Sequence, residues 1–340
     1  MVLHLLLVRH GESVDNVAGL YAGSRDSPLT NHGVLQAQRL GAHLAARSAT
    51  IGPVHHIFAS NLKRAVKTAQ TIAEAQSRVE GVDMVPEIVQ STELREKDFG
   101  SEEGKRFGTR GKQEALDVAK AADWIEPESQ DLMKKRIERF VDAFFVPTVL
   151  QAASDGGPGS IVIVAHGIIL NVLLRSLLVR FGPEEIAKLA KPGDAAWRSE
   201  WLASWSNTGF LEAELRVTTP VAVPALIIPA LKTESVDGLA AVERSIVQGD
   251  DSGTTPAEDT AAVDHPEAVS TSAASAPIPN SVSDSGIRLT VRTVNCIEHL
   301  QGLKKTRGGI GSAGHDEKQK TMDSFFSRPA KKLKRDESDV

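Results

Sequence analysis

Two short apolar runs constrain the fold more than any other feature of this 340-residue chain. Leu3–Val8 and Ser160–Ala165 are apolar at nearly every position and lack the alternation of a strand that has one solvated face. Such runs are typical of interior strands in a parallel sheet that helices cover on both faces. Up to about Val217, further β-rich runs such as His56–Ala59 alternate with longer helical stretches. The sequence therefore predicts an α/β fold, a three-layer sandwich with a mostly parallel central sheet and helices on both faces.

The stretches between these runs carry helix signals. Thr30 precedes a stretch with apolar residues at helical spacing, and Ser60 is placed to cap the helix that follows the second strand. The sequence also predicts an amphipathic helix over Leu132–Leu150 and a largely apolar helix over Ile168–Val179.

The composition changes after Val217. Residues 218–285 are rich in Ala, Val, Pro, Ser, Thr and Asp and contain no aromatic residue, which favours disorder. Gly209–Leu215 before this segment and Ile287–Val294 after it both alternate like strands, so we expect them to be neighbours at the sheet edge. The sequence therefore predicts a folded domain (1–217 and 286–303), a disordered insertion (218–285) and a disordered tail (304–340).

Charge, cysteine content and hydropathy exclude several classes of function. Lys and Arg total 39 against 44 Asp and Glu, a net charge of −5, which makes the chain a poor general nucleic-acid binder. Cys296 is the one cysteine, so the chain can form no internal disulfide and no cysteine-cluster zinc site, as is typical of a reducing compartment. No apolar run reaches the roughly 18 residues that a membrane span needs. We expect a cytoplasmic or nuclear protein that binds neither nucleic acid directly nor a membrane.

A histidine followed by glycine stands at the end of each of the two apolar runs, after Arg9 in the first and directly after Ala165 in the second. His10 follows the first run and His166 the second. Because the carboxyl ends of parallel strands meet at one edge of a sheet, where open α/β sheets bind ligands, we expect the two imidazoles to converge. A neutral imidazole at His10 can attack phosphorus, while Arg9 and Arg64 can grip the phosphate oxygens bidentately. His166 can stabilise the equatorial charge of the group in transfer.

The leaving oxygen of a phosphate ester needs a proton, so a carboxylic acid with a raised pKa is expected opposite the nucleophile. Glu96 is the preferred candidate, and Glu93 and Asp98 in the same segment are rivals. None of the other histidines pairs with a carboxylate at convincing metal-ligand spacing, so we predict a site without a metal ion or other cofactor.

These separated motifs together resemble the histidine phosphatase superfamily, also called the phosphoglycerate mutase-like family. Arg9-His10-Gly11 matches the signature of that family at the end of its first strand, and Asn16 matches a phosphate-contacting residue. The remaining matches are Asp26–Thr30 with Gly33, Ser60–Ala65 with Thr68, Glu96, Ala165–Gly167, and Asn295–Leu300, which resembles the closing strand of the family. The resemblance covers 1–217 and 286–303 and implies a phosphoglycerate mutase-like fold.

The resemblance also implies a role for each matched residue. His10 is expected to form a phosphohistidine intermediate, and Glu96 to be the proton donor. The expected contacts of the substrate phosphate are Arg9, Asn16, Arg64, His166 and Gly167. The substrate is expected to be a phosphorylated small molecule or a phosphoprotein.

Hydrolysis is favoured over isomerisation, because the mutase branch carries Glu-Arg-His-Tyr-Gly where this chain has Glu96-Lys97-Asp98-Phe99-Gly100. Two alternatives to a phosphomonoester hydrolase remain open. One is a phosphoglycerate mutase-type phosphotransferase. The other is a catalytically weak module that binds phosphorylated ligands and is tethered through its tail, although the complete catalytic set speaks against it.

The tail contains a second, independent motif. Gln319, Met322, Phe325 and Phe326 are spaced for one helical turn that fills an apolar groove. The motif resembles the one by which replication and repair proteins bind the sliding clamp, proliferating-cell nuclear antigen (PCNA). The basic patch 331–335 is typical of a nuclear-import signal. We expect the clamp as a partner through 319–326; the alternative is that the two phenylalanines dock back onto the folded domain.

Overall fold

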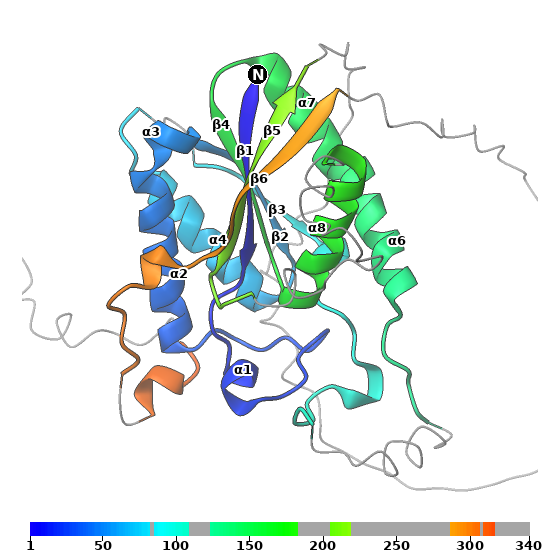
Figure 1. Ribbon diagram of the computed structural model, residues 1–340. Coiled ribbons are helices and arrows are strands. Elements are labelled where there is room, and N and C mark those ends of the chain that lie inside the picture. The colour runs from blue at the N-terminus through cyan, green and yellow to red at the C-terminus, as the bar shows by residue number, and fades with distance from the viewer. Residues whose placement is uncertain (82–84, 109–122, 183–204, 219–285, 307–308, 317–340) are drawn as a thin grey trace, which may run out of the picture. The chain divides into compact units, whose positions relative to one another are not determined.

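The computed structural model describes residues 1–81, 85–108, 123–182, 205–218, 286–306 and 309–316. Within this part of the chain, a central β-sheet carries helices on both of its faces (Figure 1). This arrangement confirms the predicted α/β sandwich.

The sheet has six strands, four of them parallel to one another. The strands are β1 (Val2–Arg9), β2 (Val54–Ser60), β3 (Ile88–Ser91), β4 (Gly159–Ala165), β5 (Phe210–Val217) and β6 (Ile287–Cys296). Their order across the sheet is β3-β2-β4-β1-β5-β6. β1 pairs in parallel with β4, and β2 pairs in parallel with both β4 and β3, whereas β5 and β6 add an antiparallel edge. The two apolar runs of the sequence are thus the neighbouring strands β1 and β4.

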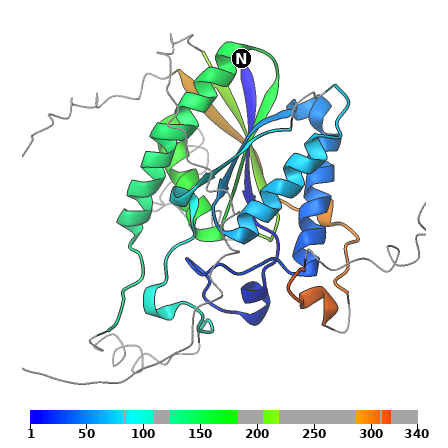
Figure 2. The ribbon, with the colours of Figure 1, turned by 180° about the vertical axis from the view of Figure 1, so that it is seen from behind.

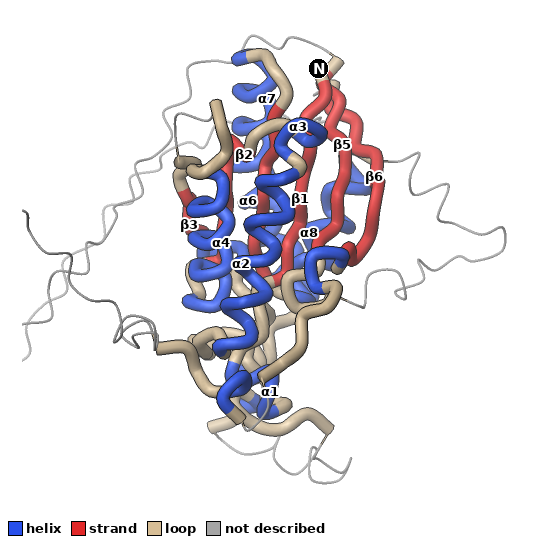
Figure 3. Tube along the Cα trace, turned by 90° about the vertical axis from the view of Figure 1, so that its left-hand side faces the viewer, coloured by secondary structure: helices blue, strands red, loops and turns tan. Residues whose placement is uncertain are grey.

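Two layers of helices cover the sheet. The helices are α1 (Val14–Ala18), α2 (Asn31–Ala46), α3 (Ser48–Ile51), α4 (Lys63–Gln76), α6 (Gln130–Phe140), α7 (Val146–Asp155) and α8 (Gly167–Phe181). α2 and α4 lie on one face of the sheet, and α6, α7 and α8 lie on the other (Figure 2, Figure 3). Short 3-10 helices occupy Thr92–Leu94, Gly100–Glu102, Glu298–Leu300 and Ile310–Ser312.

Alternate side chains of β1 enter two different cores. Leu5 and Leu7 pack in the cluster that includes α6 and α8, whereas Leu6 and Val8 pack in the cluster that includes α2 and α4. All four side chains are fully buried, which stabilises the fold by about 1.5–3 kcal/mol each relative to exposure. Burial on both faces explains why this run has no polar alternation.

The predicted helix over Leu132–Leu150 is longer than expected and changes its winding. α6 continues through a π-helical turn at Val141–Phe145 into α7. Pro147, in the first turn of α7, has no N–H to donate to the carbonyl of Ala143, which accounts for the local change of hydrogen bonding.

The predicted Ser60 cap of α4 is wrong. Leu62 occupies the cap position without a side-chain hydrogen bond, and Asp26 from a distant loop accepts the N–H of Lys63 at 2.7 Å. Ser60 is the last residue of β2, and its hydroxyl bonds to His166.

The predicted pairing of the two alternating segments is confirmed. β5 and β6 pair in antiparallel fashion, and Val217 lies opposite Ile287. The N–H of Thr218 donates to the carbonyl of Gly286 at 2.9 Å, so the two ends of their connection meet. Residues 219–285 of the predicted insertion lie outside the described residues.

The predicted closing strand over Asn295–Leu300 is wrong beyond Cys296. Asn295 adopts a left-handed φ of 49°, and Glu298–Leu300 form a 3-10 helix after the strand has ended. Asn295 lies within β6 at an irregular part of its pairing with β5, and Cys296 still pairs with Phe210 before the strand ends.

The clamp-binding-like motif 319–326 and the basic patch 331–335 lie beyond the described residues. In the described ranges, the helices are all too short or too polar to cross a membrane.

Candidate active site

The carboxyl ends of β1 and β4 bring His10 and His166 together. His10 directly follows β1, and His166 follows β4 and occupies the cap position of α8. Their ring centroids lie 5.0 Å apart, with the ring planes tilted by 59°. Both residues are buried, at 3% and 1% exposure. The sequence predicts this convergence from the strand pattern alone, and the parallel pairing of β1 with β4 produces it.

A single contact sets the protonation of the His10 ring. Its Nδ1 lies 2.6 Å from the carbonyl oxygen of Gly11. Because a carbonyl oxygen can only accept, Nδ1 carries the proton and the neutral ring keeps its lone pair on Nε2. The backbone holds the residue in place as well, since its N–H donates to the Ala165 carbonyl at 3.0 Å.

His166 has the opposite tautomer. The Nε of Arg64 donates to its Nδ1 at 3.1 Å, so Nδ1 carries no proton. The proton therefore sits on Nε2, which donates to the hydroxyl of Ser60 at 2.8 Å. Both ring nitrogens of His166 are engaged by protein groups.

Arg64 is almost completely buried, and its guanidinium is hydrogen-bonded to other groups of the protein. Besides His166, its guanidinium donates to the carbonyls of Arg25, Ala22 and Gly23 at 2.7, 2.9 and 3.0 Å. These four bonds leave at most one N–H for a ligand. In this structure the guanidinium of Arg64 bonds His166 and three carbonyls, and its expected bidentate contact with a phosphate stays a prediction.

Arg9 differs from Arg64 at Nε, which in Arg64 donates to His166. One terminal nitrogen of Arg9 donates to the Trp205 carbonyl, but the buried Nε has no hydrogen-bond partner among the described residues. Gly167 lies next to this nitrogen, since a Cβ added there would be 4.0 Å from Arg9 Nε. An unpaired buried guanidinium N–H is costly unless a ligand completes it.

Asn16 offers a donor to the same region. Its amide oxygen accepts from the Ser13 N–H and from Asn207 Nδ2, both at 3.1 Å. Because both partners are donors, the orientation of the amide is defined and its Nδ2 remains for a ligand. Asn207 also donates to the carbonyl of His10 at 3.2 Å, which ties Asn16 to the strand end.

Glu96 lies at the amino end of α8. Its carboxylate accepts the N–H groups of Ile168 and Ile169 at 3.0 and 3.1 Å, and that of Lys97 at 2.9 Å. The two rivals point elsewhere. Glu93 pairs with Arg139 on an exposed surface, and Asp98 accepts the N–H of Gly100.

The pKa values follow from burial and from the two arginines. Burial, and then the charges of Arg64 and Arg9, hold the pKa of His10 well below its usual value of 6.5. Burial, then Arg64 and His10, do the same to the pKa of His166. Burial raises the pKa of Glu96, against the opposing effect of its three N–H bonds and Arg64. The site therefore favours neutral imidazoles and a carboxyl group that protonates more readily than usual.

The turn before β5 supports the strand end that carries His10, a contact that the sequence did not predict. The N–H of Thr208 donates to the carbonyls of Arg9 and His10 at 3.0 and 3.2 Å, with Thr208 held at a left-handed φ of 58°. Its hydroxyl accepts from His299 Nε2 at 2.9 Å. Burial, then His43 and Arg39, lower the pKa of His299 to about 4, so this buttress is neutral. The sequence signal for this contact is a polar turn before a predicted strand. That turn lies beside His10 only because β5 runs antiparallel to β1.

No group of three or more His, Cys, Asp or Glu side chains is arranged to hold a metal ion in the part of the chain that the structure describes.

Comparison with known proteins gives a consistent set of matches. The sequence profile of the histidine phosphatase superfamily (branch 1) matches residues 5–198. A probable phosphatase of Schizosaccharomyces pombe is 36% identical over 180 residues, 52% of this chain and 56% of that protein. The adenosylcobalamin/alpha-ribazole phosphatase of Salmonella typhimurium is 34% identical over 182 residues, 52% of this chain and 80% of that protein. A 2,3-bisphosphoglycerate-dependent phosphoglycerate mutase of Azorhizobium caulinodans is 32% identical over 187 residues, 54% of this chain and 85% of that protein.

The match spans little more than half the length of the Schizosaccharomyces pombe relative. It covers most of the length of the two bacterial relatives, one a phosphatase and the other a mutase.

Proposed function

The chain belongs to the histidine phosphatase superfamily, and we propose that it hydrolyses phosphomonoesters through a phosphohistidine on His10. The observation that carries the proposal is the hydrogen bond from His10 Nδ1 to the Gly11 carbonyl, in a ring whose centroid lies 5.0 Å from that of the buried His166 ring. It leaves the Nε2 lone pair available in a neutral ring, as a nucleophile requires.

In the first step, the Nε2 lone pair forms a bond to phosphorus and the bond from phosphorus to the leaving oxygen breaks. Arg9 Nε, which lacks a partner among the described residues, and Asn16 Nδ2, whose amide oxygen accepts two bonds, donate to the phosphoryl oxygens. The N–H of Gly167 is the third donor, because Glu96 takes those of Ile168 and Ile169 in the first turn of α8.

Glu96 supplies a proton to the leaving oxygen. Its Oε1 accepts two N–H groups and its Oε2 only one, so Oε2 has the lone pair on which the proton is held. The raised pKa of the carboxyl favours the protonated form before the reaction.

In the second step, water attacks the phosphohistidine and Glu96, now a carboxylate, takes its proton. The bond between phosphorus and Nε2 breaks, its electron pair returns to His10, and inorganic phosphate leaves. Arg64 and Ser60 keep His166 in one orientation beside the transferring group throughout.

Phosphate release from a panel of phosphomonoesters tests the proposal. We expect turnover by the full chain and none by a folded His10→Ala variant. Turnover by a folded His10→Ala variant at the wild-type rate would refute the role of His10.

A mutase is the second candidate, favoured by the 32% identity to the Azorhizobium enzyme. A mutase needs a bisphosphorylated primer and moves the phosphoryl group without releasing it. Release of phosphate in the absence of primer supports the hydrolase, whereas primer-dependent isomerisation of phosphoglycerate without release supports the mutase.

A further inference from the structure

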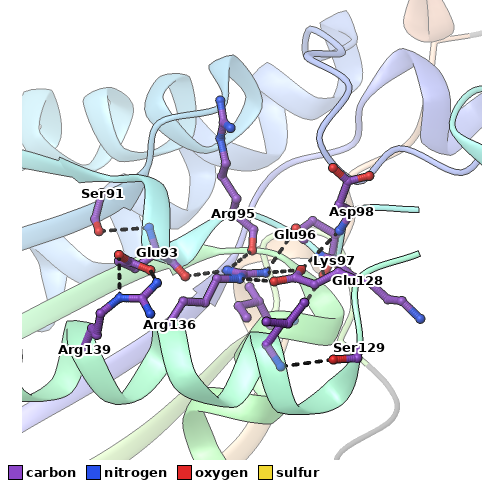
Figure 4. Close-up of polar contacts among 12 residues, drawn as sticks. Ser91, Glu93, Arg95, Glu96, Lys97, Asp98, Glu128, Ser129, Arg136 and Arg139 are labelled. Carbon is purple, nitrogen blue, oxygen red and sulfur yellow. Dashed lines mark hydrogen bonds and ion pairs between the residues drawn. The ribbon is translucent and has the colours of Figure 1, made fainter. Parts of the chain in front are cut away.

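Arg136 on α6 is a charged side chain to which the proposed chemistry gives no task. Only 8% of the residue is exposed, so its charge must be compensated within the protein. The guanidinium donates to three backbone carbonyls of one short segment, those of Glu93, Arg95 and Glu96, at 2.5, 2.7 and 3.2 Å. Figure 4 shows the guanidinium facing this segment, which we call the acid loop (Glu93–Asp98).

Glu128 holds both Arg136 and the far end of the acid loop. Its carboxylate accepts two bonds from Arg136, at 2.7 and 2.9 Å, and both side chains are largely buried. The same carboxylate accepts the N–H of Asp98 at 3.3 Å, and the N–H of Glu128 donates to the Asp98 carbonyl at 2.8 Å. The backbone is thus fixed at and before Glu96 by Arg136, and after it by Glu128.

The side chain of Glu96 is fixed by a different element. Its carboxylate accepts the N–H groups of Ile168 and Ile169 in the first turn of α8. The backbone of the residue is therefore attached to α6 and its carboxyl group to α8. A catalytic group misplaced by about 1 Å can lose roughly 100-fold in rate, so such double attachment bears directly on the proton transfer.

We propose that Arg136, paired with Glu128, is a positioning residue that holds the acid loop so that Glu96 meets the leaving oxygen. The inference rests on the proposed function. The role requires arginine, because its planar guanidinium makes five hydrogen bonds here, to three carbonyls and to both oxygens of Glu128, whereas an ammonium group has only three N–H donors.

Arg139 provides a matched control. It lies one turn further along α6, is exposed, and pairs with the side chain of Glu93 at 2.9 Å. Arg136→Lys and Arg139→Lys therefore make the same change on the same helix, but only the first removes contacts to the loop backbone.

The experiment measures both variants of the full chain on two substrates. An alkyl phosphate needs protonation of its leaving oxygen, whereas 4-nitrophenyl phosphate does not. Glu96→Gln is measured beside them, and thermal unfolding followed by circular dichroism records the folded fraction.

We expect Arg136→Lys to lower kcat on the alkyl phosphate by about 10–100-fold and on the aryl phosphate by less than about threefold, with little change of KM. Arg139→Lys keeps both activities. A residue that only stabilises the fold would lower both activities in the same proportion, so an equal loss on the two substrates, or no loss, overturns the proposal.

If Arg136→Lys fails to fold, the Glu128→Gln variant tests the positioning role in its place. It preserves the shape of the side chain, removes the charge of the pair, and is expected to shift the ratio of the two activities in the same direction. If Glu96→Gln does not distinguish the substrates, the acid role in the proposed function is wrong. If Glu96→Gln distinguishes the two substrates, and Arg136→Lys and Glu128→Gln both leave the ratio of the two activities unchanged, only the positioning role of Arg136 is wrong.

Discussion

Each imidazole of the site is held in one tautomer by a neighbour of fixed hydrogen-bonding character. The Gly11 carbonyl can only accept, so His10 keeps its lone pair on Nε2. The Nε of Arg64 can only donate, so His166 keeps its proton on Nε2. The two histidines share the same local sequence, His-Gly after a buried strand. They nevertheless differ at Nε2, where His10 has a lone pair and His166 has a proton.

Removing the Ser60 hydroxyl tests the arrangement of His166. Ser60→Ala leaves the buried Nε2–H without an acceptor, which should lower the free energy of unfolding by about 1–3 kcal/mol and also lower kcat. Chemical denaturation and phosphate release measure the two effects. Ser154→Ala, which removes an exposed hydroxyl bonded to the Leu150 carbonyl, should change stability by less than about 0.5 kcal/mol. Equal behaviour of the two variants would show that Ser60 does not hold His166.

The pH profile tests Glu96. The acid must be protonated, so activity on an alkyl phosphate should fall as the pH rises through the pKa of Glu96, which burial raises above 4.5. The nucleophile must be neutral, and because the pKa of His10 lies well below 6.5, activity should be lost on the acid side only well below that pH. Glu96→Gln should lack the alkaline limb. The substrate ionises identically with both proteins, so the difference between their profiles isolates Glu96; identical profiles would contradict its role as the acid.

Strand ends were enough to predict from the sequence that His10 and His166 converge. They did not separate Glu96 from its rivals Glu93 and Asp98, because those side chains differ in their tertiary partners. What Arg64 does was not predictable, because its three carbonyl partners lie in a loop far away along the chain. The same holds for Thr208, whose contacts depend on the direction of the strand that follows it.

At the scale of elements, the β5–β6 pair closes the sheet beside the site. The amino end of β5 contacts the residues that follow β1, and its carboxyl end is joined to β6 through residues 219–285. Since Thr218 and Gly286 are hydrogen-bonded to each other, a short turn can replace the connection without moving either strand.

Replacing 219–285 by a short Gly- and Asn-containing turn should therefore leave the melting temperature within a few degrees of wild type and keep kcat within about twofold. Circular dichroism melting and phosphate release check both values. Replacing 92–98 by a turn of the same kind is the inactive control, because it removes the acid. Loss of the folded state on removal of 219–285 would show that this segment is part of the domain.

Strands and helices with strong periodicity were predictable, and their observed ends differ from the predicted ones by a few residues. The short strand β3 was missed because Ile88–Ser91 offers only four residues and is paired along one side by β2. The cap of α4 was mispredicted because the group that bonds its first N–H, Asp26, comes from another part of the chain. Local sequence cannot contain such tertiary partners.

At the scale of the whole molecule, the tail is proposed to bind the sliding clamp through 319–326. A peptide of 315–335 should bind the clamp in calorimetry, and Phe325→Ala with Phe326→Ala should abolish binding, because the two rings fill the apolar groove. Replacement of the basic patch 331–335 by serine should weaken binding only modestly and in a salt-dependent manner. No heat of binding alongside a working control peptide would end the proposal.

The layered fold was predictable at this scale because two apolar runs followed by His-Gly leave few ways to bury the strands and join their ends. The substrate was not predictable from the sequence, because a fold of this kind does not determine which ester enters the site.

The phosphohistidine mechanism is tested most directly by identifying the atom that is phosphorylated during turnover. The chain is mixed with substrate, quenched in alkali within a single turnover, and analysed by peptide mass spectrometry and phosphorus NMR. We expect one acid-labile, alkali-stable phosphoryl group on His10 Nε2 that forms at least as fast as kcat. Full-rate phosphate release with no phosphorylated protein, or with the label on another residue, would contradict it.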